Sequence, residues 1–393
     1  MQAGGRVALE MEYDVIVVGA GIAGASIAYE LARSCRVCVV EGETRPGYHA
    51  TGRSAALFAP SYGGREIRAL TRASLAFFRD PGRAFGEQPL LSPRGCMYVA
   101  RDDQRVRLEA MVRDLRSSGS RVTTIDAGAA RLYVPRLRPG HVVTAAFDAD
   151  AMDIDVDALH QGFLRGARAS GAELVKGCWV ERVERMQGRW CIETAAGTVT
   201  APTLVNAAGA WADVVAEHCG ARALGMQALR RTAALVDAPD GSDVRTWPAV
   251  IDADELFYFK PEAGQLLLSP ADETPTPPCD VLPDELDIAI AVDRVQAALE
   301  LDVRHVKRSW AGLRTFAPDR VPVVGFDVRV PGLFWCAGQG GYGIQSAPAL
   351  ARAAAALVLR QPLPPDIAAE GLDAAAVSPA RFEPSPAAAA SLG

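Results

Sequence analysis

Three glycines near the start of the chain, Gly19, Gly21 and Gly24, have the G-x-G-x-x-G spacing that can hold the pyrophosphate of a dinucleotide. The first glycine of such a unit permits a tight turn, the second lets the backbone approach the phosphates, and the third lets a helix pack on a strand. Glu41 follows Gly21 by twenty residues, from where a carboxylate can bind a ribose 2′-hydroxyl. Because an acid there disfavours a 2′-phosphate, the expected cofactor is FAD or NAD.

The secondary structure predicted around these glycines is the strand, helix and second strand that a dinucleotide-binding site needs. An apolar run at 15–18 predicts a strand, the Ala-rich segment up to Arg33 predicts a helix, and a second apolar run at 37–40 predicts the strand that ends at Glu41. The N-terminus of the helix would then face the phosphates. This combination favours a dinucleotide site over a plain strand-to-helix turn.

Two distant segments resemble this first unit in pattern. Residues 203–211 are apolar and end in small residues, and residues 332–336 lead into a glycine-rich stretch and an Ala-rich helix. An NAD domain usually completes its site within one contiguous block, so these distant turns favour FAD. Further predicted elements are helices over 67–79, 155–170 and 286–301, strands over 179–186, 189–194 and 198–201, and a hairpin of 256–260 with 265–269.

Length and composition restrict the class of protein. The chain has 393 residues, 49% of them apolar, which is enough for two cores and hence two domains. With a net charge of -6 and scattered basic residues, we expect no nucleic-acid partner. No apolar stretch approaches the roughly twenty residues of a membrane span, and the N-terminus lacks a signal-peptide pattern, so a cytoplasmic protein without a transmembrane segment is expected. Residues before Met11 are left out of the fold, and a disordered tail is expected over 383–393.

The cysteines and histidines predict neither disulfides nor a metal site. Eight cysteines in a chain of this length lie mostly inside apolar runs and are interpreted as small buried residues. Cys35 and Cys38 have C-x-x-C spacing, but they flank a strand and lack the helix N-terminus of a redox pair, so buried thiols are favoured. The five histidines have no metal-ligand spacing.

Several ordered segments resemble the D-amino acid oxidase superfamily of FAD proteins, and are most similar to bacterial D-arginine dehydrogenase and related D-amino acid dehydrogenases. These segments are VIVVGAGIAGAS, RPGYHATGRSAALF, DIDVDALHQGFLRGAR, LVNAAGAWAD, SWAGLRTFAPD and GQGGYGIQ. The resemblance extends from Tyr13 to about Phe382. It implies an α/β fold with a Rossmann-like FAD-binding domain that is discontinuous in sequence (11–85, 145–218 and 306–382). A second, antiparallel-sheet substrate domain of α+β type would comprise 86–144 and 219–305.

The resemblance also implies which residues bind FAD. The pyrophosphate would lie at Gly19 to Gly24 and the ribose at Glu41, with further contacts along the flavin, at the adenine, and at the ribityl chain and pyrimidine end. The implied residues are Gly19, Gly21, Ile22, Ala23, Gly24, Glu41, Gly42, Thr51, Gly52, Arg53, Ser54, Ala55, Val180, Ala208, Gly209, Gly338, Gly340, Gly341, Tyr342, Gly343 and Ile344. Relatives that attach the flavin covalently use cysteine or histidine, whereas the matching stretches here have Ser54 and Thr315 to Phe316. The resemblance therefore implies non-covalent FAD.

The implied reaction is hydride transfer from Cα of an amino acid to flavin N5, which leaves an imine that hydrolyses to a 2-oxo acid. By the resemblance, Arg314 binds the substrate carboxylate with Tyr258 beside it, Arg231 is a second pocket arginine, and Gly341 offers its carbonyl to the amine. Gln345 matches a pocket residue, and Tyr62 matches a mobile lid tyrosine. A secondary-amine or 2-hydroxy-acid dehydrogenase, and a flavin-binding protein without turnover, are the alternatives.

The chain departs from the arginine-specific pattern in the substrate pocket. Leu57 and Ala59 stand where that enzyme has histidine and threonine, and Cys96 stands where it has the glutamate for a cationic side chain. A guanidinium would be unpaired in such a pocket, so an apolar side chain is predicted and D-arginine is rejected, unless another acid such as Glu66 or Glu87 approaches. The strand QLLLS lacks the lysine with which related oxidases activate oxygen, and Lys260 lies on the other hairpin strand. We therefore expect a dehydrogenase with a quinone or dye-like acceptor.

Overall fold

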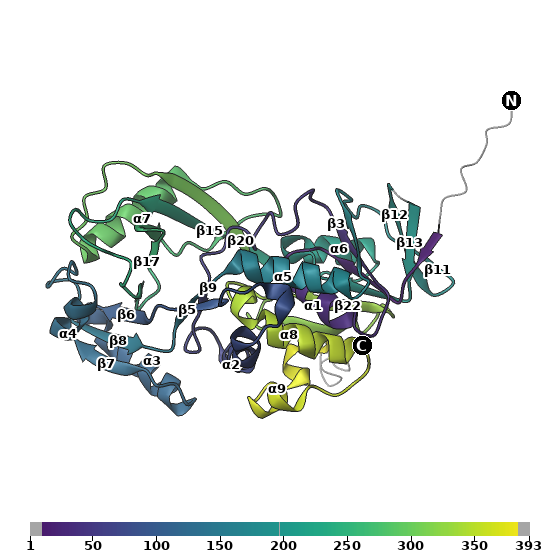
Figure 1. Ribbon diagram of the computed structural model, residues 1–393, viewed down its shortest axis with the longest axis horizontal. Coiled ribbons are helices and arrows are strands. Elements are labelled where there is room, and N and C mark those ends of the chain that lie inside the picture. The colour runs from purple at the N-terminus through teal and green to yellow at the C-terminus, as the bar shows by residue number, and fades with distance from the viewer. Residues whose placement is uncertain (1–9, 196, 384–393) are drawn as a thin grey trace, which may run out of the picture.

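The computed structural model describes residues 10–195 and 197–383, which form two lobes, each built on its own large sheet. Figure 1 shows the FAD-binding domain on the right, with α1 (Ile22–Leu31), α5 (Val156–Ala169) and α8 (Gly343–Val358), and the substrate domain on the left. The chain crosses between the lobes several times. Both domains are therefore discontinuous in sequence, as predicted.

The FAD-binding domain contains a six-stranded sheet in the order β10-β3-β2-β14-β22-β21. All neighbouring strands are parallel except β21, which runs antiparallel to β22. The strands are β10 (Glu173–Lys176), β3 (Val37–Glu41), β2 (Val15–Val18), β14 (Thr203–Asn206), β22 (Leu333–Ala337) and β21 (Val323–Phe326). The two predicted strand, glycine-turn, helix units are thus β2 to α1 and β22 to α8, and both open at the carboxyl edge of this sheet, where α/β proteins bind ligands.

Strand residues alternate between the two faces of this sheet. Val15 and Val17 pack with α1 and α8 on one face, whereas Ile16 and Val18 face a layer that includes α6 (Ala212–His218) and a small four-stranded sheet. That sheet has the order β1-β13-β12-β11, with β1 (Glu10–Glu12), β13 (Gly197–Ala201), β12 (Arg189–Thr194) and β11 (Glu184–Met186). The strand expected over 179–186 is therefore shorter than predicted. The helices α2 (Arg65–Arg79), α9 (Pro365–Ala369) and α10 (Ala374–Val377) complete the domain.

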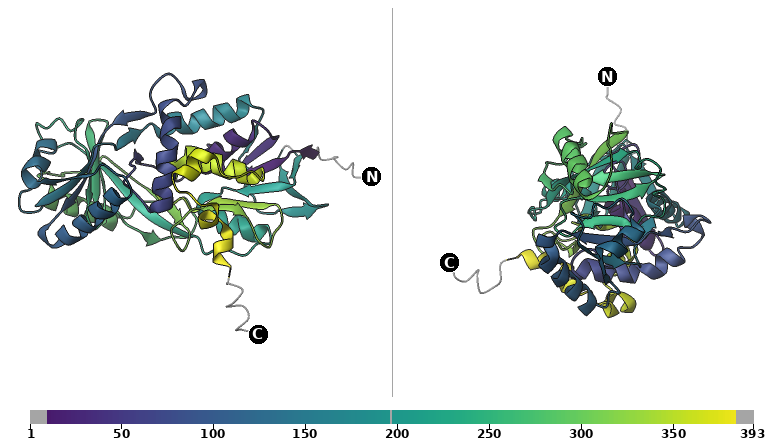
Figure 2. Two further views of the ribbon diagram at one scale, coloured as in Figure 1. Left: turned by 90° about the horizontal axis from the view of Figure 1, so that it is seen from below. Right: turned by 90° about the vertical axis from the view of Figure 1, so that its left-hand side faces the viewer.

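The substrate domain, on the left in the left-hand view of Figure 2, contains a nine-stranded sheet. Its main path is β19-β15-β18-β17-β16-β6-β8-β7, with β20 paired to β15. Its pairs are antiparallel apart from β16 with β6. The strands are β19 (Thr274–Pro275), β15 (Gln227–Val236), β18 (Gln265–Ser269), β17 (Tyr258–Glu262), β16 (Ala249–Asp252), β6 (Cys96–Ala100), β8 (Thr144–Asp148), β7 (Thr123–Asp126) and β20 (Arg308–Phe316). Helices α3 (Arg105–Ser117), α4 (Ala127–Tyr133) and α7 (Glu285–Ala298) accompany the sheet.

Two of the expected domain boundaries need correction. The boundaries at 144/145 and 305/306 assigned β8 and β20 to the FAD-binding domain, but both strands hydrogen-bond within the nine-stranded sheet. Near the junction, β4 (Leu57–Phe58), β9 (Met152–Ile154) and β5 (Leu91–Pro93) form a three-stranded sheet. The expected disorder over 383–393 falls almost entirely outside the described residues.

The cysteines are free thiols among the described residues. Burial raises the pKa of Cys38 to about 12, and burial also raises the pKa of Cys35. A reactive redox pair needs a lowered pKa, which neither thiol has. Cys38, Cys96, Cys219 and Cys336 are buried as predicted, but Cys35, Cys178, Cys191 and Cys279 are only half-buried. Within 10–195 and 197–383 no helix is long and apolar enough to cross a membrane, and no cluster of side chains is suited to a metal ion.

Candidate active site

A continuous cavity of about 430 Å³ extends from the first glycine-rich turn to the substrate domain. It contains most of the predicted site residues, from both domains. On the cofactor side these are Gly19, Gly21, Ile22, Ala23, Glu41, Gly42, Thr51, Arg53, Ser54, Ala55, Val180, Ala208, Gly209, Gly340, Gly341, Gly343 and Ile344. On the substrate side they are Leu57, Ala59, Tyr62, Arg231, Tyr258, Arg314 and Gln345. Gly24, Gly52, Gly338, Tyr342 and Cys96 were also predicted, but they do not line the cavity.

The glycine-rich turn has no room for side chains. Gly19 has a φ of 98°, and a Cβ there would lie 2.6 Å from the Ala207 carbonyl oxygen. A Cβ on Gly24 would lie 1.8 Å from the Gly19 carbonyl oxygen, so this glycine allows α1 to pack on the turn without facing the cavity. The turn and the N-terminus of α1 therefore form a backbone cradle that fits a pyrophosphate.

Two side chains complete this cradle. Thr51 Oγ1 accepts a hydrogen bond from the Ile22 N–H at 2.9 Å, so its own proton remains free for a phosphate oxygen. At the end of β3, Glu41 accepts hydrogen bonds from the N–H groups of Ala20 (2.6 Å) and Glu43 (2.8 Å). The Glu41 carboxylate is thereby fixed at the cavity wall, where the sequence predicted the ribose contact. These residues would hold the adenosine and pyrophosphate of FAD.

Arg314 lies at the opposite end of the cavity on β20. Its guanidinium packs flat against Gly341, where a Cβ would lie 2.7 Å from Nη1. Burial alone would lower the pKa of Arg314, but the nearby Tyr62 and Tyr258 raise it above its ordinary value. Arg314 forms no ion pair with a carboxylate in the part of the chain that the structure describes. It is a charged group available for an anionic ligand.

Arg231 differs from Arg314, although both line the cavity. Its Nε donates to the Asp272 carbonyl oxygen at 2.8 Å, and its Nη2 lies 3.3 Å from Glu273 Oε1. Glu273 also pairs with Arg320, and these arginines lower the pKa of Glu273 against the opposing effect of burial. Arg231 therefore already has a carbonyl acceptor and shares a carboxylate with Arg320, so it is a weaker candidate for the substrate carboxylate than Arg314.

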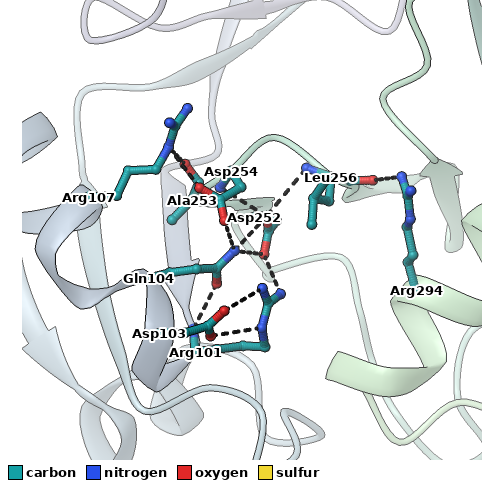
Figure 3. Close-up of polar contacts among 9 residues, drawn as sticks. All are labelled: Arg101, Asp103, Gln104, Arg107, Asp252, Ala253, Asp254, Leu256 and Arg294. Carbon is teal, nitrogen blue, oxygen red and sulfur yellow. Dashed lines mark hydrogen bonds and ion pairs between the residues drawn. The ribbon is translucent and has the colours of Figure 1, made fainter.

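Tyr258 enters the cavity beside Ile251, its direct partner across β16 and β17. The turn between these strands is held by a polar network, which Figure 3 shows. Gln104 Nε2 donates to both carboxylate oxygens of the buried Asp252 at 3.1 Å, and Arg294 Nη1 donates to the Leu256 carbonyl at 2.6 Å. Hydrogen bonds from two helical segments, one with Gln104 and one with Arg294, hold this turn in place. The substrate domain therefore fixes the orientation of Tyr258, which follows the turn.

A model of the family described as "FAD dependent oxidoreductase" matches residues 14–357. The chain belongs to this FAD-dependent oxidoreductase family. The predicted resemblance is thereby confirmed at the level of the family, and the oxidoreductase has the expected α/β fold with FAD-binding and substrate domains.

The relatives of the oxidoreductase have names that state different reactions. It is 27% identical to "Hydrogen cyanide synthase subunit HcnC" of Pseudomonas aeruginosa, over 96% of this chain and 98% of that protein. It is 26% identical to "Glycine oxidase" of Pseudomonas putida, over 86% and 92% of the two chains. The crystal structure of glycine oxidase from Geobacillus kaustophilus superposes with a TM-score of 0.81 at 24% identity, covering 94% of this chain and 98% of that one. This last similarity shows a shared fold.

The prediction that Cys96 lies in the substrate pocket of the oxidoreductase was wrong. Cys96 is fully buried on β6 within an apolar cluster of the substrate domain, and burial raises the pKa of its thiol. It does not line the cavity, so a glutamate at this position would lie in the core. Glu66 and Glu87, the acids considered as substitutes, do not line the cavity either. Lys260 is also outside it, because Asp153 (3.0 Å) and Glu262 (3.3 Å) hold its ammonium group.

Sequence reasoning missed an aromatic wall at the cofactor end, formed by Tyr48, His49, Trp179 and Trp211. The ring centroids of Trp179 and Trp211 are 5.3 Å apart, and those of Trp211 and His49 are 4.7 Å apart. A Cβ on Gly42 would lie 2.7 Å from the Trp179 ring, which explains the glycine after Glu41. The wall comes from three separate segments, so no local pattern could indicate it.

Proposed function

We propose that the protein is an FAD-dependent dehydrogenase that oxidises the Cα–N bond of a D-amino acid with an apolar side chain. The imine product would hydrolyse to a 2-oxo acid and ammonia. The observation that carries this proposal is Arg314, a charged guanidinium without a carboxylate partner among the described residues, in the same cavity as the dinucleotide cradle. The proposal for the D-enantiomer rests on the resemblance of the motifs.

Each reaction requirement has a candidate group in the cavity. Arg314 can bind the substrate carboxylate through two parallel N–H donors, and the hydroxyls of Tyr62 and Tyr258 lie beside it. Gly341, packed against this guanidinium, can offer its carbonyl oxygen to the substrate amine. Bound FAD supplies the hydride acceptor. With carboxylate and amine both held, the remaining freedom of the substrate is small, which favours reaction at Cα.

The lining supports an apolar substrate side chain. Leu57, Ala59 and Ile251 contribute apolar surface at the substrate end. Among the described lining residues the carboxylates are Glu41 and Glu181, and both lie with the cofactor residues. A lysine or arginine side chain of the substrate would therefore lose its hydration without gaining a counter-ion, which is unfavourable by several kcal/mol.

Glycine or a secondary amine is the second candidate substrate. The name of one relative, glycine oxidase, favours glycine. Arg314 would bind the carboxylate of these substrates equally well. A third possibility is flavin binding without turnover.

Anaerobic reduction of the bound flavin separates these candidates. The panel would contain D- and L-leucine, D-arginine, glycine, N-methylglycine and a 2-hydroxy acid, with absorbance near 450 nm as the readout. We expect D-leucine to bleach the flavin fastest. Faster bleaching by glycine or N-methylglycine would favour the second candidate, and no bleaching by any compound would favour a binding protein.

We predict that FAD is bound without a covalent link. Ser54 and Thr315 line the cavity at the places where related enzymes attach the flavin through cysteine or histidine. Acid precipitation of the purified protein should leave all yellow colour in the supernatant. Colour that stays in the pellet would contradict this and would direct attention to Cys178 and Cys279, the thiols of the described cavity lining.

We also predict slow reaction of the reduced protein with oxygen. Related oxidases use a lysine near the flavin to stabilise developing superoxide, and Lys260 is held outside the cavity by Asp153 and Glu262. Turnover with a quinone or a dye should exceed turnover with oxygen by about tenfold or more, and Lys260→Met should leave the oxygen rate unchanged. Hydrogen peroxide formed in air at the full dye-linked rate would refute this.

A further inference from the structure

Three buried polar side chains, Ser61, Tyr98 and Asp148, meet just outside the cavity. They are 5%, 4% and 3% exposed, and Tyr98 belongs to a hydrophobic cluster against which Tyr62 packs. Ser61 belongs to the loop between β4 and α2 of the FAD-binding domain, whereas Tyr98 on β6 and Asp148 at the end of β8 belong to the substrate domain. Burying polar groups in such surroundings is costly unless they are paired, so this contact between domains calls for a specific role.

The Asp148 carboxylate accepts hydrogen bonds from Ser61 and from the backbone of Asp150. Ser61 Oγ donates to Asp148 Oδ2, the Asp150 N–H donates to Oδ1 at 3.0 Å, and the Tyr98 hydroxyl lies 3.3 Å from Ser61 Oγ. Burial raises the pKa of Asp148, and the donors Ser61 and Asp150 N–H oppose that rise. Removing the carboxylate would leave Ser61 without its main acceptor.

The residue after Ser61 is the cavity residue Tyr62. The turn that contains both is closed by the Tyr62 N–H, which donates to the Ala59 carbonyl at 3.0 Å. Gln345 holds the other side of the turn, since its Oε1 accepts from the Ala59 N–H at 3.0 Å and its Nε2 lies 3.5 Å from the Tyr62 carbonyl. The turn is therefore clamped between Gln345 of the FAD-binding domain and Asp148 of the substrate domain, and it places Tyr62 in the cavity that Arg314 also lines.

We propose that Asp148 is a positioning residue for carboxylate binding, which acts through Ser61 to hold the Tyr62 hydroxyl on Arg314. This inference rests on the proposed role of Arg314 as the carboxylate anchor. It assigns Asp148 no contact with the substrate. The effect of replacing Asp148 on carboxylate binding should therefore depend on the Tyr62 hydroxyl. A general loss of stability would not depend on that hydroxyl.

A double-mutant cycle on benzoate binding tests the inference, because benzoate carries a carboxylate and an apolar ring and its binding can be followed by the flavin spectrum. Asp148→Ala should weaken benzoate binding about 3- to 30-fold, the range of couplings between residues in one network. The same change made in Tyr62→Phe should have almost no further effect. Asp148→Asn, which keeps an acceptor oxygen, should restore binding to within about threefold.

The neighbouring acid gives a matched control. Asp150→Asn alters a side chain that pairs with Arg121, keeps the backbone N–H that donates to Asp148, and should leave benzoate binding unchanged. If Asp148→Ala fails to fold, Ser61→Ala enters the same cycle. The inference would be overturned if Asp148→Ala weakened benzoate binding equally in proteins with and without the Tyr62 hydroxyl. It would also be overturned if Asp148→Ala bound benzoate as tightly as the wild type. If the proposed role of Arg314 were wrong, Arg314→Met would bind benzoate as tightly as the wild type, and this result is distinct from those of the Asp148 cycle.

Discussion

Replacing Arg314 by methionine should raise the dissociation constant of the amino acid substrate by about 30-fold to several thousand-fold. The change removes a charge-assisted contact inside a cavity, which costs about 2 to 5 kcal/mol, and each 1.4 kcal/mol is tenfold in affinity. Flavin content should stay at the wild-type level, because Arg314 lies at the end of the cavity away from the glycine-rich turn. Titration of the flavin spectrum with substrate under anaerobic conditions gives both quantities.

Arg231→Met is the matched control for this experiment. Arg231 lines the same cavity, but the Asp272 carbonyl and Glu273 already hold its guanidinium. Its loss should therefore weaken substrate binding less than the loss of Arg314. If Arg231→Met has the larger effect while Arg314→Met binds substrate normally, the carboxylate site has been assigned to the wrong arginine.

D-Leucine, D-methionine or D-phenylalanine should have specificity constants at least about a hundredfold above those of D-arginine and D-lysine. An apolar pocket gains about 0.8 kcal/mol for each buried methylene, but it cannot stabilise an unpaired cation. A hundredfold ratio corresponds to about 3 kcal/mol in transition-state binding. Steady-state turnover with an artificial dye would measure the ratio.

A glutamate placed inside the cavity should reverse part of this preference. Leu57 is the suitable position, since it lines the cavity and Cys96 does not. Leu57→Glu should raise the specificity constant for D-arginine relative to D-leucine, whereas Leu57→Gln, with the same shape and no charge, should not. D-Arginine as the best substrate of the wild type would contradict the apolar pocket.

The cofactor side of the cavity could be predicted because much of it is formed by residues that are close together in sequence. The strand, turn and helix at 15–31 follow each other in sequence, and Gly19 and Gly24 are required by contacts that any such unit makes. Glu41 was found because β3 pairs directly with β2 and ends at the same edge of the sheet. The second glycine-rich turn could be related to the first because it repeats the same pattern.

The substrate side could be predicted only in part, because its residues are brought together by tertiary packing. The segments SWAGLRTFAPD and GQGGYGIQ, which are long and distinctive, correctly placed Arg314 and Gln345 in the cavity. Cys96 was misplaced because the flanking match is short and each residue of a strand faces the opposite side from its neighbour. Sequence also gave no sign of the charge compensation at Arg231 or of the contact between Ser61 and Asp148, since both depend on segments far apart in the chain.

Flavin reduction by D-leucine labelled with deuterium at Cα tests the central claim most directly. In an anaerobic stopped-flow experiment, the account predicts that wild-type flavin is reduced by D-leucine with one 2-oxo acid formed per flavin, and that deuterium slows the reduction about twofold or more because the Cα–H bond is broken in that step. L-Leucine should reduce it far more slowly. A flavin that D-leucine leaves oxidised while a 2-hydroxy acid or a secondary amine reduces it would contradict the account.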